Sequence, residues 1–91
     1  MLKLVLEEIP VLINKMYEAT NNERYTDIKE ISHQLKGASS NMCLHKLKEI
    51  SQEVYFSNKK YKSYYLRKFE EVNKEYNKIE KIIKRELEKN D

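Results

Sequence analysis

The stretch of residues 26–42, TDIKEISHQLKGASSNM, gives the clearest indication of the fold. Its apolar residues recur every three or four positions, which is the spacing of one face of a helix. They are Ile28, Ile31, Leu35, Ala38 and Met42. Thr26 or Asn22 could cap such a helix, and Asp27 suits its first turn. The pattern predicts a helix over about 26–42 with one buried face.

Three further segments carry the same spacing and predict helices over about 2–19, 44–56 and 60–89. The first stripe consists of Leu2, Val5, Leu6, Ile9, Leu12, Ile13 and Met16. The second consists of Leu47, Ile50 and Val54, and the last of Tyr61, Tyr65, Phe69, Val72, Tyr76, Ile79, Ile83 and Leu87. Pro10 falls inside the first segment, so the chain forms either one interrupted helix or a short turn before a helix from about Ile9. We favour the interrupted helix.

The breaks between these segments are short and polar, so sequential helices are expected to lie antiparallel. Gly and Pro occur once each, which argues against a fold with many strands and turns. A chain of 91 residues has room for one domain. We therefore predict one all-α domain over residues 1–91, an antiparallel up-down four-helix bundle. At about 1.5 Å per residue, the final helix would extend beyond its neighbours.

The positive charge is concentrated in the middle of the chain. The net charge is +3, but residues 33–68 alone carry eight basic and two acidic side chains, a net +6. The flanking segments are net −2 and −1. This centre predicts a docking surface for an acidic partner. It also suggests a basic helical nucleic-acid binder as an alternative, although the mixed charge of the last helix argues against that reading.

The composition also bears on location and on metal binding. No apolar run reaches membrane length, no signal peptide leads the chain, and Cys43 has no partner for a disulfide. These features indicate a cytoplasmic protein. Cys43 is expected to be a small apolar filler, and His45 an exposed residue at the start of a helix. Neither has metal ligands at a suitable spacing, so no metal site is predicted.

Three residues within 26–42 form a candidate functional site. His33 lies on the polar face of the helix, Lys36 follows one turn later, and Gly37 is the only glycine in the chain. A glycine inside a helix costs about 1 kcal/mol relative to alanine, which suggests that another molecule approaches the backbone there. A neutral imidazole is a nucleophile near neutral pH. Phosphoryl transfer needs positioning and charge neutralisation, which Lys36 would supply.

This stretch resembles the signature of histidine-containing phosphotransfer domains, roughly His-x-Leu-Lys-Gly-[Ser/Ala]-Ser-x-x-Leu-Gly. The matching residues are His33, Leu35, Lys36, Gly37, Ala38 and Ser39, with Met42 in place of the later leucine. The expected layout of helices also agrees, so the resemblance covers nearly the whole chain.

The resemblance implies a role for each residue of the site. His33 would be phosphorylated through its outward ring nitrogen, Lys36 would neutralise the phosphoryl charge, and Gly37 would leave clearance for the docked partner. Three further residues would rim the docking surface. They are Lys29, Gln34 and Ser40.

The resemblance also implies the partners, which are receiver domains of response regulators and of hybrid sensor histidine kinases. His33 would exchange the phosphoryl group with their aspartates in a two-component signalling pathway. The receiver would bring the Mg²⁺, so no cofactor, nucleotide or metal is expected on this chain. The protein would be a phosphocarrier rather than an enzyme. We expect a monomer, because the site must stay accessible, and Met1 favours a stand-alone carrier.

Two positions depart from the family pattern. The glycine after the leucine is Cys43 here, and a left-handed backbone there would cost a residue with a side chain roughly 1 kcal/mol. The Glu or Gln that commonly holds the inner ring nitrogen is replaced by Tyr55, so Tyr55 or Gln52 would orient the ring. These departures motivate an alternative function, a docking module that inhibits or tethers a response regulator without transferring phosphate.

Overall fold

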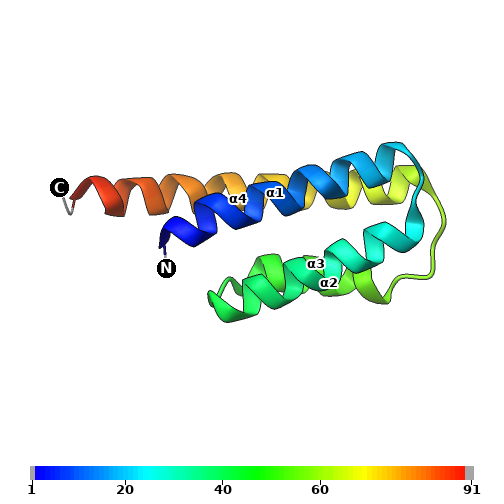
Figure 1. Cartoon of the computed structure of the whole chain (residues 1–91), viewed down its shortest axis with the longest axis horizontal. Coiled ribbons are helices and arrows are strands. Elements are labelled where there is room, and N and C mark those ends of the chain that lie inside the picture. The colour runs from blue at the N-terminus through cyan, green and yellow to red at the C-terminus, as the bar shows by residue number, and fades with distance from the viewer. Residues whose placement is uncertain (1, 90–91) are drawn as a thin grey trace.

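The computed structural model describes residues 2–89, with side chains from Val5 onward, so the expected packing of Leu2 lies outside the described residues. Over this range the chain forms four α-helices and no strand, which confirms the predicted all-helical class (Figure 1). The helices are α1 (Leu2–Asn21), α2 (Tyr25–Asn41), α3 (His45–Phe56) and α4 (Lys62–Lys89).

The four helices pack in a ring. α1 contacts α2 and α4, and α3 contacts the same two helices on the other side. Figure 1 shows the chain reversing its direction at each of the three connections. The molecule measures 46 × 20 × 16 Å, and α4 supplies the long dimension, because 28 residues at about 1.5 Å each span roughly 42 Å. As expected, the last turns of α4 extend beyond α2 and α3 (Figure 1).

The core is formed by apolar side chains from all four helices. The buried ones are Val5, Ile9, Leu12, Ile13, Met16, Ala19, Ile28, Leu35, Ala38, Leu47, Ile50, Val54, Tyr65, Val72, Tyr76 and Ile83. Each predicted stripe therefore supplies core residues. Leu6, Ile31, Met42, Phe69, Ile79 and Leu87 are partly buried against this core. Burial of these stripes is the main source of stability.

The prediction that Tyr61 is the first core residue of the segment 60–89 was wrong. Tyr61 is 66% exposed and precedes α4, which begins at Lys62 rather than at residue 60. The Tyr61 carbonyl accepts hydrogen bonds from the backbone N–H groups of Tyr64 and Tyr65, so its backbone starts the helix while its side chain stays in solvent. The core contribution of α4 therefore begins at Tyr65.

α1 is one helix that passes through Pro10. The alternative of a short turn followed by a separate helix is therefore wrong. Proline has no N–H to donate to the preceding turn. The apolar face of the helix continues on both sides of it, with Val5, Ile9 and Ile13 all buried. This packing against α2 and α4 holds the helix together across the missing hydrogen bond.

The connection between α2 and α3 turns at Cys43, which has a φ of 58°. The Leu44 N–H donates to the Ser39 carbonyl at 2.8 Å, and the Cys43 N–H donates to the Ser40 carbonyl at 3.2 Å. This pair of bonds is the Schellman arrangement that ends a helix in a left-handed residue. The Cys43 side chain is exposed, so the expectation of an apolar filler was wrong.

The connection between α1 and α2 has the same form. Glu23 has a φ of 55°, and the Arg24 N–H donates to the Ala19 carbonyl at 2.8 Å. Arg24 occupies the N-cap position of α2 and makes no side-chain capping bond. The predicted caps, Thr26 and Asn22, were therefore wrong, because Thr26 already lies within α2.

Candidate functional site

His33 lies in the middle of α2 with its side chain exposed. Lys29, Lys36 and Ser40 lie four before, three after and seven after it, so all four share one face of the helix. The opposite face of α2 is buried in the core. The helix therefore presents His33 and Lys36 outward from a fixed support.

The buried face of α2 includes two polar side chains that were not anticipated. Ser32 and Ser39 are completely buried. They are seven residues apart, and Ser32 lies three before Leu35 and Ser39 four after it, so both fall on the apolar face. This register was readable in the sequence, and it indicates that small side chains are needed where α2 meets its neighbours.

The His33 ring packs against Tyr55 of α3. The two ring centroids lie 5.0 Å apart, and the ring planes are tilted by 35°. Such aromatic contacts are worth about 0.5–1.5 kcal/mol beyond the area that they bury. No hydrogen bond to the His33 ring is found within residues 5–89. Tyr55 therefore reaches the histidine through its ring face, whereas Gln52 is exposed one turn earlier.

Phe56 extends this surface beside Lys36. The Lys36 ammonium lies 5.7 Å from the centroid of the Phe56 ring, and the Phe56 ring meets Tyr55 edge-on at 5.1 Å. Phe56 is 63% exposed, which is unusual for so large an apolar side chain. Sequence reasoning missed it, although Phe56 falls outside the stripe of Leu47, Ile50 and Val54. The histidine is thus flanked by an aromatic pair and a lysine.

Gly37 is exposed, and the space around it is empty. A methyl group added to it would meet no atom within 4 Å beyond its own helix backbone, and its φ is not positive. Neither packing nor backbone conformation within the chain therefore requires a glycine here. Because glycine weakens a helix interior by about 1 kcal/mol relative to alanine, nothing within the chain accounts for a glycine at this position.

The three predicted rim residues lie in different places. Lys29 donates a 3.4 Å hydrogen bond from Nζ to Asn58 Oδ1, which links α2 to the loop after α3. Ser40 is exposed on the His33 face. Gln34 is not brought to this face. It points toward α1, where it lines a shallow cavity with Lys15 and Glu18.

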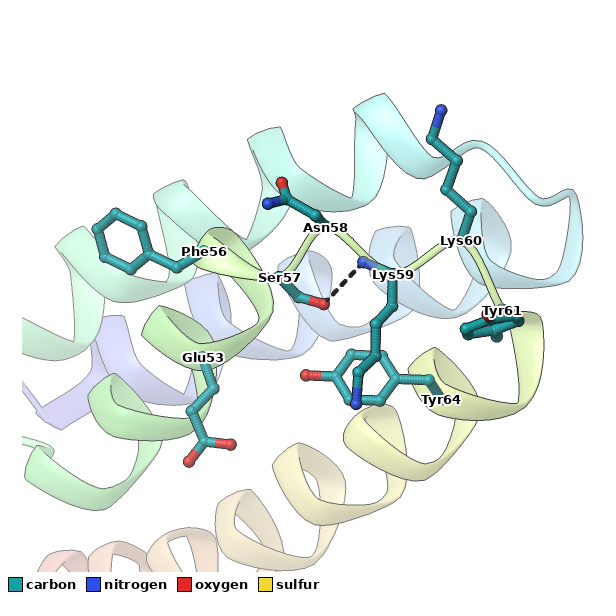
Figure 2. A pocket seen from close by; sticks show the side chains of 8 residues that line it. All are labelled: Glu53, Phe56, Ser57, Asn58, Lys59, Lys60, Tyr61 and Tyr64. Atoms are coloured by element: carbon teal, nitrogen blue, oxygen red, sulfur yellow. Dashed lines mark hydrogen bonds between the residues drawn. The ribbon is translucent and has the colours of Figure 1, made fainter.

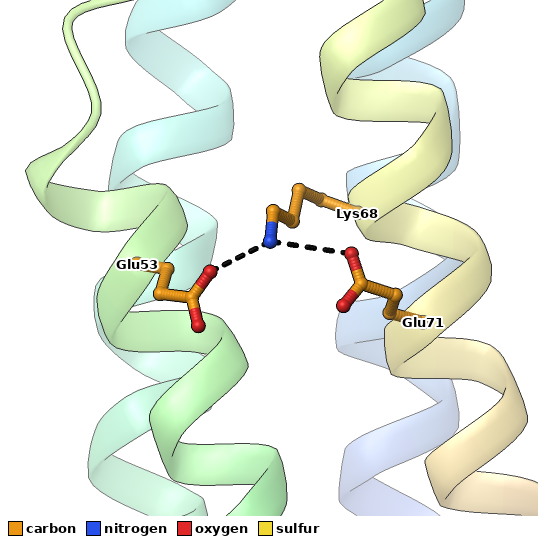
Figure 3. Close-up of polar contacts among 3 residues, drawn as sticks. All are labelled: Glu53, Lys68 and Glu71. Atoms are coloured by element: carbon orange, nitrogen blue, oxygen red, sulfur yellow. Dashed lines mark hydrogen bonds and ion pairs between the residues drawn. The ribbon is translucent and has the colours of Figure 1, made fainter.

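A cluster of ion pairs joins α3 to α4 near this site. Lys68 Nζ lies 2.6 Å from Glu53 Oε2 and 3.2 Å from Glu71 Oε2 (Figure 3). The hydrogen bond to Glu53, with Glu71 beside it, raises the pKa of Lys68. By contrast, Lys29 and Lys36 make no ion pair among the side chains that the structure describes. The surface around His33 therefore keeps its positive charge.

The described residues contain no group of three or more His, Cys, Asp or Glu side chains that could hold a metal ion. His45 is exposed at the first position of α3, as expected. None of the four helices, as far as the structure describes them, is both long and apolar enough to cross a membrane.

Comparisons with known proteins agree with this geometry. A family model described as Hpt domain matches residues 1–60, which is 60 of the 91 residues and includes α1, α2 and α3. No curated protein and no solved structure matches the chain.

Proposed function

Because the chain belongs to the Hpt domain family, whose members carry phosphoryl groups on histidine in two-component signalling, we propose that it is a phosphorelay intermediate that accepts and donates a phosphoryl group on His33. One observation carries the proposal. His33 is exposed on a helix face that also presents Lys36 and the open backbone of Gly37. We also propose that the bundle is the antiparallel up-down form expected from its short connections.

The proposed reaction begins with a phosphorylated receiver aspartate. The outward ring nitrogen of His33 attacks the phosphorus with its lone pair, and a P–N bond forms as the P–O bond to the aspartate breaks. The aspartate leaves as a carboxylate, and the proton on the other ring nitrogen becomes free to exchange with solvent. Lys36 neutralises charge on the phosphoryl oxygens. Reversal of these steps passes the group to a second receiver.

Tyr55 is the proposed positioning residue for the histidine. In place of a hydrogen bond to the inner ring nitrogen, the packed Tyr55 ring restricts the rotation of the imidazole. An imidazole held in one orientation loses less freedom when it enters the reaction. Gln52, the other candidate, has no contact of this kind in the described part of the chain.

The proposed partners are the receiver domains of a response regulator and of a hybrid sensor kinase. We also propose that the carrier is a monomer and that it meets these receivers in the cytoplasm. Receivers carry acidic active sites, and the uncompensated Lys29 and Lys36 would speed their association. The receiver would hold the Mg²⁺. The carrier itself would need no cofactor, and it is better described as a covalent intermediate than as an enzyme.

The test uses a phosphorylated receiver domain and a small phosphoramidate as donors. Intact mass and phosphorus NMR should show an acid-labile phosphoryl group that passes on to an added unphosphorylated receiver. His33→Gln should abolish it. His45→Gln is the matched control, because His45 is the only other histidine and is also exposed. We expect this variant to accept phosphate from the receiver as the unchanged protein does.

A folded protein that accepts no phosphate would contradict the proposal. Circular dichroism would first establish that the protein is helical. If His33 then stayed unmodified with both donors, the transfer mechanism would be wrong. Binding of a receiver under those conditions would favour the docking module that has lost its chemistry.

A further inference from the structure

A shallow groove of about 720 Å³ lies beside the loop that joins α3 to α4 (Figure 2). Its walls come from the end of α3, the loop and the first turn of α4. The lining residues are Glu53, Phe56, Ser57, Asn58, Lys59, Lys60, Tyr61 and Tyr64. Two of these residues contact side chains near His33, because Phe56 lies beside Lys36 and Asn58 accepts a hydrogen bond from Lys29.

The groove is positively charged. Lys59 and Lys60 form no ion pair within residues 5–89. Lys59 instead lies with its ammonium 4.6 Å from the centroid of the Tyr64 ring. The single acidic wall residue, Glu53, is bound to Lys68 (Figure 3). Because Lys68 is shared between Glu53 and Glu71, Glu53 keeps part of its charge, but the two unpaired lysines outnumber it and can attract an anionic partner.

The groove also presents large aromatic surfaces to solvent. Phe56 is 63% exposed and Tyr61 is 66% exposed. In Figure 2 they lie at opposite ends of the loop, with Tyr64 between them. Aromatic side chains are enriched in protein interfaces, where they act as anchors.

The loop is held in place by the bundle beneath it. The Tyr65 hydroxyl, at the end of a buried side chain, donates to the Lys59 carbonyl at 2.5 Å. The Ser57 hydroxyl accepts from the Lys59 N–H at 3.2 Å. Lys29 is joined to Asn58. A groove whose loop is fixed before binding loses little entropy when a partner arrives.

The groove is continuous with the histidine face across α3. Successive helix positions are about 100° apart, so Phe56 points between Tyr55 and Glu53 on the outer side of α3. Tyr55 contacts His33 on α2, and Glu53 contacts Lys68 on α4. A standard interface covers about 800 Å² on each partner, which is enough to include both surfaces.

We propose that this groove is a second docking surface, which receives an acidic segment with an apolar side chain from the receiver domain that exchanges phosphate with His33. The receiver's carboxylates would meet Lys59 and Lys60, and its apolar side chain would lie against Phe56 and Tyr61. The inference rests on the proposed function. It assigns partner choice to a surface that takes no part in the chemistry, so the groove should govern receiver affinity and not the reactivity of His33.

The experiment measures phosphoryl transfer from the His33-phosphorylated protein to the receiver domains encoded in the same genome. Lys60→Glu and Tyr61→Ala are the groove variants. Lys81→Glu is the matched charge control, because Lys81 is exposed on the distal part of α4 and makes no ion pair among the described side chains. Tyr17→Ala on α1 is the aromatic control, since Tyr17 is 45% exposed.

We expect each groove variant to raise by about tenfold the receiver concentration at which the transfer rate is half-maximal, the loss typical of an interface anchor, with the maximal transfer rate little changed. The effect of Lys60→Glu should shrink as salt is added. Phosphorylation by phosphoramidate should not change, because this small donor reacts with His33 without docking on the groove. Both controls should behave as the unchanged protein does.

The outcomes separate this inference from the proposed function. If no receiver takes the phosphoryl group, the proposed function fails and this inference falls with it. If a receiver takes it but Lys60→Glu and Tyr61→Ala match their controls, the second surface is ruled out and the phosphocarrier stands. If the groove variants change the oligomeric state instead of the half-saturating receiver concentration, the groove contacts another copy of the chain, and the inference is likewise overturned.

Discussion

Glu23 and Cys43 occupy equivalent positions in the two turns that begin and end α2, with φ angles of 55° and 58°. Each is the left-handed residue within a Schellman turn, one position before the residue that closes it, and each is exposed. The histidine helix is therefore bounded at both ends by a left-handed residue that carries a side chain. Its start and end are set by backbone geometry rather than by side-chain caps.

Replacing Cys43 by glycine should stabilise the protein. Glycine adopts a positive φ without the roughly 1 kcal/mol penalty of a residue with a Cβ, and the exposed thiol contributes no core packing. We expect Cys43→Gly, and equally Glu23→Gly, to raise the free energy of unfolding by about 1 kcal/mol in urea titrations. Asn41→Gly, two residues earlier within α2, should lower it instead. A loss of stability in Cys43→Gly would contradict this account of the turn.

Gly37→Ala should separate stability from docking. An added methyl group meets nothing in the chain, so alanine should strengthen α2 by about 1 kcal/mol. The same methyl group would stand where the receiver approaches, so transfer from a phosphorylated receiver should slow while labelling by phosphoramidate does not. Thermal unfolding and transfer rates measure the two effects. Asn77→Ala is the control, because Asn77 is exposed on α4 away from the His33 face, and equal receiver kinetics in both variants would argue against clearance at Gly37.

The contact between His33 and Tyr55 predicts different results for two substitutions. Tyr55→Phe keeps the ring that packs against the imidazole, so transfer should proceed at nearly the original rate. Tyr55→Ala removes it, and a loss of about 0.5–1.5 kcal/mol corresponds to a rate lower by up to about tenfold. Rapid-quench measurement of receiver transfer would test this. If Tyr55→Phe were as slow as Tyr55→Ala, the hydroxyl rather than the ring would orient the histidine.

The buried Tyr76 predicts a loss of stability in alkali. Burial, with Glu80 nearby, raises the pKa of Tyr76 to about 12, against 10.0 in the unfolded chain. Below pH 10 both states are protonated and its contribution is fully present. Between pH 10 and 12 the unfolded chain loses the proton first, so stability falls by on the order of 2 kcal/mol.

Comparison with Tyr76→Phe isolates this contribution from the other groups that titrate in the same range. The variant lacks the ionisable hydroxyl, so its urea midpoint should fall less steeply between pH 9 and 11.5. A parallel decline of the two proteins would show that Tyr76 titrates normally.

The helices were predictable because their signals are local and redundant. Each stripe repeats every three or four residues, so an error at Tyr61 left the rest of α4 correctly placed. The candidate site at His33, Lys36 and Gly37 could also be proposed from the sequence, because a lone glycine inside a helix is costly and has to be explained. The turns were less predictable, because their hydrogen bonds involve only backbone atoms that any residue can supply.

The groove could not have been found from the sequence. Phe56 and Tyr61 resemble core residues in type, and although Phe56 falls outside its stripe, only the structure establishes that both are exposed. The ion pair between Glu53 and Lys68 depends on two side chains 15 residues apart on different helices. The same holds for Tyr55, whose contact with His33 joins positions 22 residues apart.

The overhang of α4 has a practical consequence. The final turns of this helix extend past α2 and α3, and the site lies on those two helices (Figure 1). A fluorophore or a surface anchor attached near Lys89 would stand clear of an incoming receiver and would not disturb the core. The carrier could therefore be immobilised through this end on a sensor chip, with His33 still open to every receiver passed over it.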